Sequence, residues 1–254
     1  MSEISLCVQH LNKSFGGVAA TQDVSMDFPK GSLTAIIGPN GAGKTTFFNL
    51  ISGALKPDSG KVLLEGDDIT QMSSAEIVSK GIGRAFQVAK LFKTLTVEES
   101  LRAALMSPAG KSTNLTRRFP MPETRERADE TMELLGLTSK AKSISGNLSH
   151  GDQKLMDIAL ALAMKPKVLL LDEPIAGLGP EERNKMIETV YRLWQTGGLT
   201  LIFIEHDMDI VFRIAQTVNV LCYGKLLARG KPDDIRNNPA VIEAYLGVAH
   251  GEPA

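Results

Sequence analysis

Short, uninterrupted apolar runs along the chain predict strands that are buried on both faces. They cover residues 33–37, 168–171 and 199–204. Runs of this length without polar alternation are typical of parallel strands that helices cover on both sides. Helix-forming residues follow the first run, and a helix is expected from about Pro180 to Gln195 after the second. This alternation predicts an α/β core, a mostly parallel sheet flanked by helices.

Other segments have the composition of shorter strands, turns and helices. Two strand-like runs between residues 4 and 28 are separated by Ser14-Phe15-Gly16-Gly17, and they predict an antiparallel N-terminal β-subdomain. Further strands are expected at 61–65 and 82–86, a hairpin at 218–222 and 225–228, and helices at 73–80 and 239–246.

Residues 96–150 change to helical periodicity. Breaks at 108–112 and 120–122 divide this stretch, which we interpret as a mostly helical subdomain inserted into the α/β core. The basic pair Arg117-Arg118 within it is typical of a solvated loop. Because the sequence contains no internal repeat or low-complexity linker, residues 1–254 are expected to form a single domain. Its last part, about 232–254, is expected to be a short helical tail.

Composition and charge narrow the possible classes of protein. Of the 254 residues, 43% are hydrophobic and 22% are charged, as in an ordinary globular protein. The net charge of −1 gives no global basic field, so no nucleic-acid partner is expected. No apolar run approaches the roughly 18–20 residues needed to cross a bilayer, and the first residues lack the features of a signal peptide. Cys7 and Cys222 are expected to be buried free thiols of a cytosolic chain.

The residues after the first buried run form a phosphate-binding motif. Gly38 to Thr46 have the spacing Gly-x4-Gly-Lys-Thr between a strand and a helix start, which is the context that a P-loop requires. Glycines let backbone N–H groups curl around phosphate oxygens, and a helix N-terminus favours the anion. We expect Lys44 to contact the β- and γ-phosphates and the Thr45 hydroxyl to ligate Mg²⁺. The expected phosphate-binding residues are Asn40, Gly41, Ala42, Gly43, Lys44, Thr45 and Thr46. The sequence therefore predicts a nucleotide-binding protein with a P-loop NTPase core.

Acidic and imidazole side chains follow the other buried runs. Asp172 and Glu173 come at the carboxyl end of the second run, the edge where α/β sheets bind ligands. Asp172 suits a Mg²⁺ contact, and Glu173 could polarise the water that attacks the γ-phosphate. His206 follows the third run and could hydrogen-bond the γ-phosphate or orient Glu173. Gln87 could ligate Mg²⁺, bind the attacking water or be an exposed hinge residue, and its spacing does not decide between these roles.

A second helix start lies at residues 148–153, far from the P-loop in sequence. Ser149 is placed as the N-cap of the following helix with Asp152 three residues on, an acidic analogue of a capping box. The plain interpretation is an ordinary helix start. The functional interpretation is a second anion-binding N-terminus, which a dimer sharing ATP across its interface would use.

These motifs together resemble the ATP-binding subunit of an ATP-binding-cassette (ABC) transporter over nearly the whole chain. The matching set, in the order and at the spacing of that family, is Gly38 to Thr46, Gln87, Leu148 to Gln153, Leu169 to Pro174 and His206. Phe15 lies where the family places an aromatic residue that stacks on adenine. Ser14-Phe15-Gly16-Gly17 and the tail at 238–247 are similar to the branched-chain amino acid importer branch.

The resemblance implies an ATPase that powers an importer, with ATP and Mg²⁺ as cofactors. In a head-to-tail dimer, each ATP would be held by one chain's P-loop and by Ser149, His150 and Gly151 of the other. The implied Mg²⁺ ligands are Thr45, Gln87 and Asp172, and the implied catalytic residues are Lys44, Glu173 and His206. Transmembrane permease subunits would bind near residues 87–96, with a second ATPase subunit and, indirectly, a solute-binding protein as partners. The expected location is the cytoplasmic face of the plasma membrane.

Departures from the family pattern concern the dimer. His150 and Asp152 replace a glycine and the glutamine of the usual Leu-Ser-Gly-Gly-Gln signature. At a helix start Asp152 can face solvent, but near a γ-phosphate its charge would repel. Gly179 stands where most of the family has an aspartate that couples the two sites, which favours pairing with a different ATPase subunit.

Other functions account for less of the sequence. Soluble ABC ATPases of DNA repair or translation usually have a long coiled coil or tandem cassettes, and this sequence has neither. A regulatory cassette without hydrolysis is disfavoured by Lys44, Glu173 and His206, although Gly179 leaves it open. A P-loop kinase or GTPase leaves residues 148–153 without a role, and the sequence lacks the guanine motif Asn-Lys-x-Asp. The cargo stays open, since branched-chain amino acids, urea, short amides and aromatic acids all fit.

Overall fold

Parallel strands form the centre of the molecule. The structure is a computed structural model that describes residues 3–85, 92–106 and 123–249. The larger sheet has the strand order β10-β9-β3-β8-β7-β6. Its strands are β3 (Leu33–Ile37), β6 (Ile82–Ala85), β7 (Val168–Asp172), β8 (Thr200–Ile204), β9 (Thr217–Cys222) and β10 (Lys225–Gly230). The β9–β10 hairpin is antiparallel and the other pairs are parallel, which confirms the mostly parallel sheet expected from the apolar runs.

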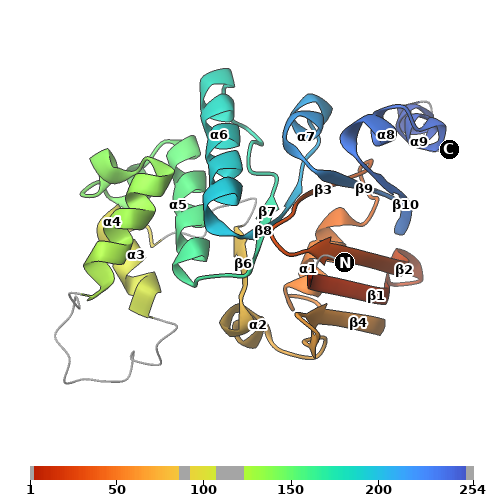
Figure 1. The fold of residues 1–254 in the computed structure, drawn as a ribbon, viewed down its shortest axis with the longest axis horizontal. Coiled ribbons are helices and arrows are strands. Elements are labelled where there is room, and N and C mark those ends of the chain that lie inside the picture. Colours follow the sequence, from red (N-terminus) through yellow and green to blue (C-terminus); the bar gives the residue numbers. More distant parts are fainter. Residues whose placement is uncertain (1–2, 86–91, 107–122, 250–254) are drawn as a thin grey trace.

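A smaller antiparallel sheet packs beside it. It has the order β2-β1-β4-β5, with β1 (Ile4–Phe15), β2 (Val18–Pro29), β4 (Ser59–Leu64) and β5 (Asp67–Asp68). β1 and β2 have 12 residues each, longer than the short strands expected, because bulges such as that between Val8 and Leu11 let the pairing continue. Helix α1 (Lys44–Ile51) lies between the two sheets, with Phe47 and Phe48 in a shared core (Figure 1).

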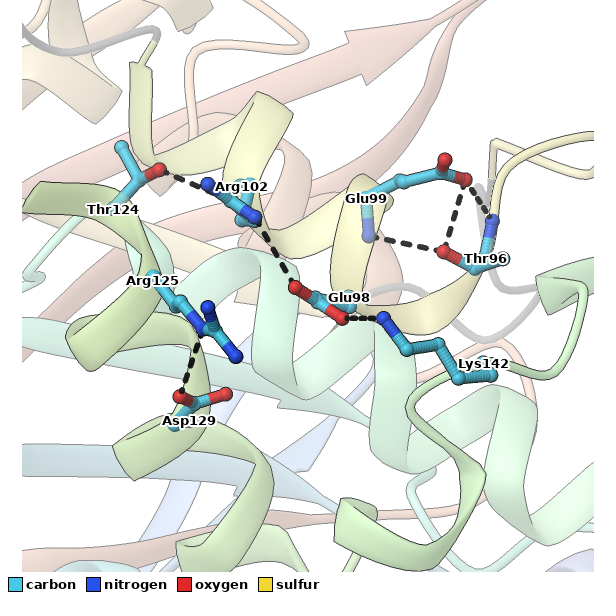
Figure 2. Close-up of polar contacts among 8 residues, drawn as sticks. All are labelled: Thr96, Glu98, Glu99, Arg102, Thr124, Arg125, Asp129 and Lys142. Carbon is cyan, nitrogen blue, oxygen red and sulfur yellow. Dashed lines mark hydrogen bonds and ion pairs between the residues drawn. The ribbon is translucent and has the colours of Figure 1, made fainter. Parts of the chain in front are cut away.

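Helices gather at the end of the large sheet that lies away from the antiparallel strands (Figure 1). They are α3 (Val97–Met106), α4 (Glu123–Leu135) and α5 (His150–Ala163), with the 3₁₀ turns η3 (Thr138–Lys140) and η4 (Ser145–Asn147) between α4 and α5. The Glu98 carboxylate of α3 accepts from Arg102 at 3.1 Å and from Lys142 at 2.6 Å. Arg102 also donates to the Thr124 hydroxyl of α4 at 3.4 Å, so polar contacts join these helices (Figure 2). Arg117-Arg118 and the break at 108–112 lie outside the described residues.

The remaining helices complete the second half of the chain. They are α6 (Pro180–Gly197), α7 (Met208–Ile214), α8 (Pro232–Arg236) and α9 (Pro239–Ala249), and α2 (Ser74–Lys80) follows β5. Helix α7 was not expected, because 7 residues are too short for a helical period to stand out. Helix α8 falls within the helical tail that was expected at about 232–254. In the described part of the chain, no helix is long and apolar enough to cross a membrane.

The cysteines are only partly as expected. Both are free, and Cys222 is buried as predicted. Cys7 is half-buried instead, because it lies on β1 between fully buried neighbours that face the core.

Candidate functional site

The loop between β3 and α1 has the backbone of a phosphate-binding turn. Gly38, Gly41 and Gly43 have φ angles of 150°, 78° and 99°. A Cβ at Gly38 would lie 2.0 Å from the Leu221 carbonyl oxygen, and one at Gly43 would lie 2.2 Å from that of Ala20. Both positions therefore require glycine. The loop ends at the N-terminus of α1, where backbone N–H groups and the helix dipole favour an anion.

Lys44, the first residue of α1, folds back onto this loop. Its Nζ donates to the Gly38 carbonyl at 2.6 Å and to the Pro39 carbonyl at 2.9 Å. Burial lowers the pKa of the Lys44 ammonium, while the charges of Glu173 and Asp172 act in the opposite sense. Phosphate oxygens would give this ammonium stronger, charge-assisted acceptors than the two carbonyls do. The lysine is therefore positioned to bind a phosphate that enters the loop.

A cleft of about 240 Å³ opens over the P-loop. Its lining residues are Ala20, Asn40, Gly41, Ala42, Gly43, Lys44, Thr45, Thr46, Glu173 and His206. The phosphate-binding residues expected from the sequence are thus brought together with the two candidate catalytic side chains. Ala20 of β2 is the addition, because its backbone carbonyl packs against Gly43. A small apolar residue on a distant strand carries no sequence signal for this position.

Glu173 and His206 meet at the carboxyl edge of the large sheet. β7 and β8 are parallel neighbours, so the residues that follow them lie side by side. Glu173 Oε1 lies 2.7 Å from His206 Nε2. Glu173 has a φ of 50°, and its N–H donates to the Ile204 carbonyl at 3.1 Å. This left-handed conformation is uncommon for a residue other than glycine, and such strain persists where the surroundings enforce it.

Asp172 is paired with an arginine that the sequence analysis did not identify. Arg84 Nη2 lies 2.9 Å from Asp172 Oδ2, and both side chains are buried. The Nη1 atom of Arg84 donates to Asn49 Oδ1 at 2.7 Å and to Ser52 Oγ at 2.9 Å. Arg84 therefore joins β6, β7 and the end of α1 beneath the P-loop. The sequence signal that could have identified Arg84 is a charged residue within a short apolar strand, because a buried charge usually has a partner.

The donor set beside the P-loop fits a magnesium ion held together with a nucleotide. Thr45 is exposed at the start of α1, and Asp172 supplies carboxylate oxygens at the end of β7, where its Oδ2 accepts from Arg84. Mg²⁺ commonly uses one or two protein oxygens and takes its other ligands from phosphates and water. In the described parts of the chain, no cluster of three His, Cys, Asp or Glu side chains forms a fuller cage. Gln87, the other expected ligand, lies outside the described residues.

The N-terminus of α5 forms a second site with its own polar network. Ser149 is the N-cap, and its Oγ accepts from the Asp152 N–H at 3.2 Å. The Ser149 hydroxyl also donates to Asp152 Oδ2 at 2.9 Å, and Lys140 forms an ion pair with the same carboxylate. Asp152 is buried against the side chain of Lys140, so the first of the two possibilities left open for it, a position facing solvent, does not hold.

Within one chain, the α5 site and the P-loop cleft are separate. Ser149 and Gly151 line a depression of about 200 Å³ together with Lys140 and residues of α6, and none of its lining residues belongs to the P-loop cleft. His150 is exposed and lies close to Gly177. Phe15 is 48% exposed at the β1–β2 turn and is not among the residues that line the cleft. Its exposed ring is available for stacking.

Comparisons with known proteins agree with these motifs. A family model described as "ABC transporter" matches residues 21–176, and one described as "Branched-chain amino acid ATP-binding cassette transporter" matches residues 225–251. The high-affinity branched-chain amino acid transport ATP-binding protein LivG of Escherichia coli (strain K12) is 38% identical, over 98% of this chain and 100% of that protein.

Solved structures give the same result. The crystal structure of the ADP conformation of an ATP-binding cassette of an ABC transporter has a TM-score of 0.85 at 35% identity, covering 97% of this chain and 100% of that one. A dimeric cassette in a post-hydrolysis state, bound to ADP and Pi, has a TM-score of 0.76 at 25% identity, covering 89% of this chain and 98% of that one. The resemblance inferred from the motifs is confirmed, and the chain belongs to the ABC transporter family of ATP-binding cassettes.

Proposed function

We propose that the chain is the ATP-binding and ATP-hydrolysing subunit of a membrane importer for branched-chain amino acids or related small solutes. The observation that carries ATP hydrolysis is the contact between Glu173 and His206 in the same cleft as the P-loop. The near full-length likeness to LivG and the family match at 225–251 support the cargo class. The soluble ABC ATPases considered above have no comparable support.

The residues of the cleft suggest how hydrolysis proceeds. Lys44 and the loop N–H groups bind the β- and γ-phosphates and hold the terminal phosphoryl group in line for attack. Thr45 and Asp172, with Gln87, would hold Mg²⁺, which when bound neutralises phosphate charge. The Glu173 carboxylate accepts a proton from the attacking water. His206 keeps that carboxylate oriented through its Nε2 contact or, when a nucleotide is bound, donates to the γ-phosphate instead.

The anion site proposed at the N-terminus of α5 requires a second cassette to complete it. Ser149 lies in a depression apart from the P-loop cleft, so one chain does not complete a site that uses both. A head-to-tail pair would bring the α5 N-terminus of each subunit to the nucleotide of the other. The dimeric cassette among the similar structures supports this arrangement. The partner is an identical or a paralogous ATPase subunit, and Gly179 favours the paralogue.

The remaining partners follow from an importer role. Permease subunits would contact the region of residues 87–96, of which 87–91 lie outside the described residues. Closure of the two cassettes on ATP would drive the permease, and a solute-binding protein would deliver the cargo to it. The chain would then sit on the cytoplasmic face of the plasma membrane.

Uptake in cells tests this function. We expect cells of the native source that lack the gene to lose ATP-dependent uptake of radiolabelled leucine, and the wild-type gene to restore it. Lys44→Ala, which removes the phosphate contact, should not restore uptake although the protein is expressed. Normal leucine uptake in the deletion strain would contradict branched-chain amino acids as the cargo, and unchanged uptake of related small solutes as well would contradict the importer function.

A further inference from the structure

Two buried charged side chains lie behind the catalytic pair, and the mechanism above does not use them. Lys154 of α5 is 5% exposed, and Glu205, between β8 and His206, is 3% exposed. Lysine and glutamate are almost never this buried unless they are paired, because removing a charge from water is costly. Neither side chain lines the P-loop cleft. Their burial therefore calls for a role other than direct phosphate contact.

Both side chains form hydrogen bonds with the backbone of the loops that follow β7 and β8 and carry Glu173 and His206. Lys154 Nζ donates to the Glu173 carbonyl at 2.8 Å. Glu205 Oε1 accepts from the Ile175 N–H at 3.0 Å, and its Oε2 accepts from the His206 N–H at 3.3 Å. Lys154 thus bonds to the loop that follows β7. Glu205 links that loop to the loop that follows β8, and the contact between Glu173 and His206 links the same two loops.

The charges of the cluster depend on one another. Burial lowers the pKa of Lys154, and the carboxylates of Glu205, Glu173, Asp157 and Asp172 oppose that shift. Burial raises the pKa of Glu205 to about 7, against the effect of its two backbone hydrogen bonds. The positive charge of Lys154 offsets the mutual repulsion of the carboxylates that surround it.

The strained backbone at Glu173 explains why such support is needed. Its φ of 50° lies in the left-handed region, which is unfavourable for a residue other than glycine, and its carboxylate contacts His206. The Lys154 bond acts on the carbonyl of this same residue. Lys154 is also 5 residues beyond the N-cap Ser149 on α5, so the helix that bears the second anion site contacts the catalytic loop directly.

We propose that Lys154 and Glu205 are positioning residues for ATP hydrolysis. Together they form a buried pair, here called the brace, that fixes Glu173 and His206 in their relative positions. This inference rests on the proposed ATPase function. The brace acts on the chemical step and not on nucleotide affinity, because neither of its side chains lines the P-loop cleft. It also gives α5 a direct link to the Glu173 of its own chain.

Steady-state ATP hydrolysis by the purified full-length chain tests the brace. We expect Lys154→Met to lower kcat by about 10- to 100-fold with KM within about threefold of wild type, as for a small displacement of a catalytic group. Lys154→Arg keeps the cation and its donors and should recover most of that loss. Glu205→Gln, which retains one acceptor, should give a smaller decrease in kcat in the same direction.

Lys56→Met is the matched control. Lys56 also donates to a backbone carbonyl, that of Met72, but it lies outside the P-loop cleft. This control should leave kcat and KM at wild-type values. The brace is overturned if Lys154→Met changes kcat no more than Lys56→Met does. It is also overturned if Lys154→Met lowers kcat, nucleotide affinity and thermal stability together and Lys154→Arg rescues none of them.

Hydrogen exchange of the nucleotide-free protein separates the brace from the proposed function. Lys154→Met and Glu205→Gln should speed amide exchange in residues 173–178 and 204–208, while Lys56→Met leaves these segments unchanged. If the wild type hydrolyses no ATP, the ATPase assignment fails and the exchange rates still decide the brace. Unchanged exchange in both segments would contradict it.

Discussion

Asp172 ends a strand that is otherwise apolar, and its buried charge is paired with a cationic side chain. Arg84 on β6 supplies that charge at 2.9 Å and bonds two side chains of the α1 region with its other nitrogen. A buried ion pair contributes little net stability by itself, but removing one partner is destabilising because the other charge is left buried without a counter-charge.

Arg84→Met should therefore destabilise the protein strongly. We expect its free energy of unfolding in urea to fall by about 3 kcal/mol, because Asp172 loses its counter-charge in a buried site. Adding Asp172→Asn should restore part of that loss, since a neutral amide costs less to bury. A single variant within about 0.5 kcal/mol of wild type would contradict the importance of this pair.

Glu205 should make stability depend on pH near neutrality. Its folded pKa of about 7 lies above its ordinary value of 4.5, mainly because of burial, with Lys154 and Glu173 as the charged groups facing it and His206 donating through its backbone. The folded protein then binds the extra proton, so the contribution to stability is present below pH 4.5 and is lost as pH rises through 7. Between about pH 5 and pH 8, wild type should lose about 2 kcal/mol relative to Glu205→Gln. Parallel pH profiles of the two proteins in urea unfolding would contradict this.

The sequence identified the residues of the cleft that have fixed spacing or end an apolar strand. Lys44, Glu173 and His206 are of this kind, because the P-loop spacing and the strand ends predict their place without a three-dimensional structure. Arg84 and Lys154 were missed. Arg84 had one sequence signal, its place in a short apolar strand, but only tertiary packing shows that each side chain is buried and which carboxylate or carbonyl it contacts. The burial of Asp152 was not predicted for the same reason, since its partner Lys140 belongs to another segment.

Helix α2 shows how local signals determine an element. Ser73 caps it, accepting from the Glu76 N–H at 3.4 Å, and the Glu76 carboxylate accepts from the Ser73 N–H at 2.7 Å. This reciprocal pair is a complete capping box, and the sequence analysis placed a helix there.

Ser73→Ala should destabilise the protein by about 1 kcal/mol, because the first turn of α2 loses its cap. Urea unfolding measures the difference. Ser74→Ala is the matched control, since Ser74 is the exposed first residue of the helix and makes no capping bond, and its stability should stay near wild type. Equal effects of the two substitutions would show that the capping box does not stabilise α2.

The length of a helix or strand decides whether its sequence pattern is long enough to predict it. The buried strands β3, β7 and β8 were expected because an unbroken apolar run carries its own signal. The 7-residue α7 was missed, because packing against neighbouring elements stabilises a helix too short to show a period. The start of α5 at the Ser149 cap was anticipated from its capping residues.

Within one chain, the helix start at the P-loop and the helix start proposed as a second anion site do not meet. The P-loop and the N-terminus of α5 line different depressions of one chain, so a shared nucleotide site requires a second cassette. This separation cannot be read from the sequence, because it depends on where α5 lies relative to α1 in the folded chain.

Dimerisation should therefore depend on ATP. In Glu173→Gln, which retains the P-loop but lacks the carboxylate, ATP should remain bound and a dimer should appear on size-exclusion chromatography only when ATP is present. Lys44→Ala in the same background should abolish the dimer because it removes the phosphate contact. A chain that binds ATP yet stays monomeric would exclude an identical pair and require a paralogous ATPase subunit.

The most direct test of the account is the rate of ATP hydrolysis by Glu173→Gln, with ATP binding measured on the same preparation. If Glu173 activates the attacking water, the hydrolysis rate should fall by about 100-fold or more while the affinity for ATP stays within about threefold of wild type. Hydrolysis at the wild-type rate by a variant that binds ATP normally would contradict the catalytic role assigned to Glu173 and the mechanism built on it.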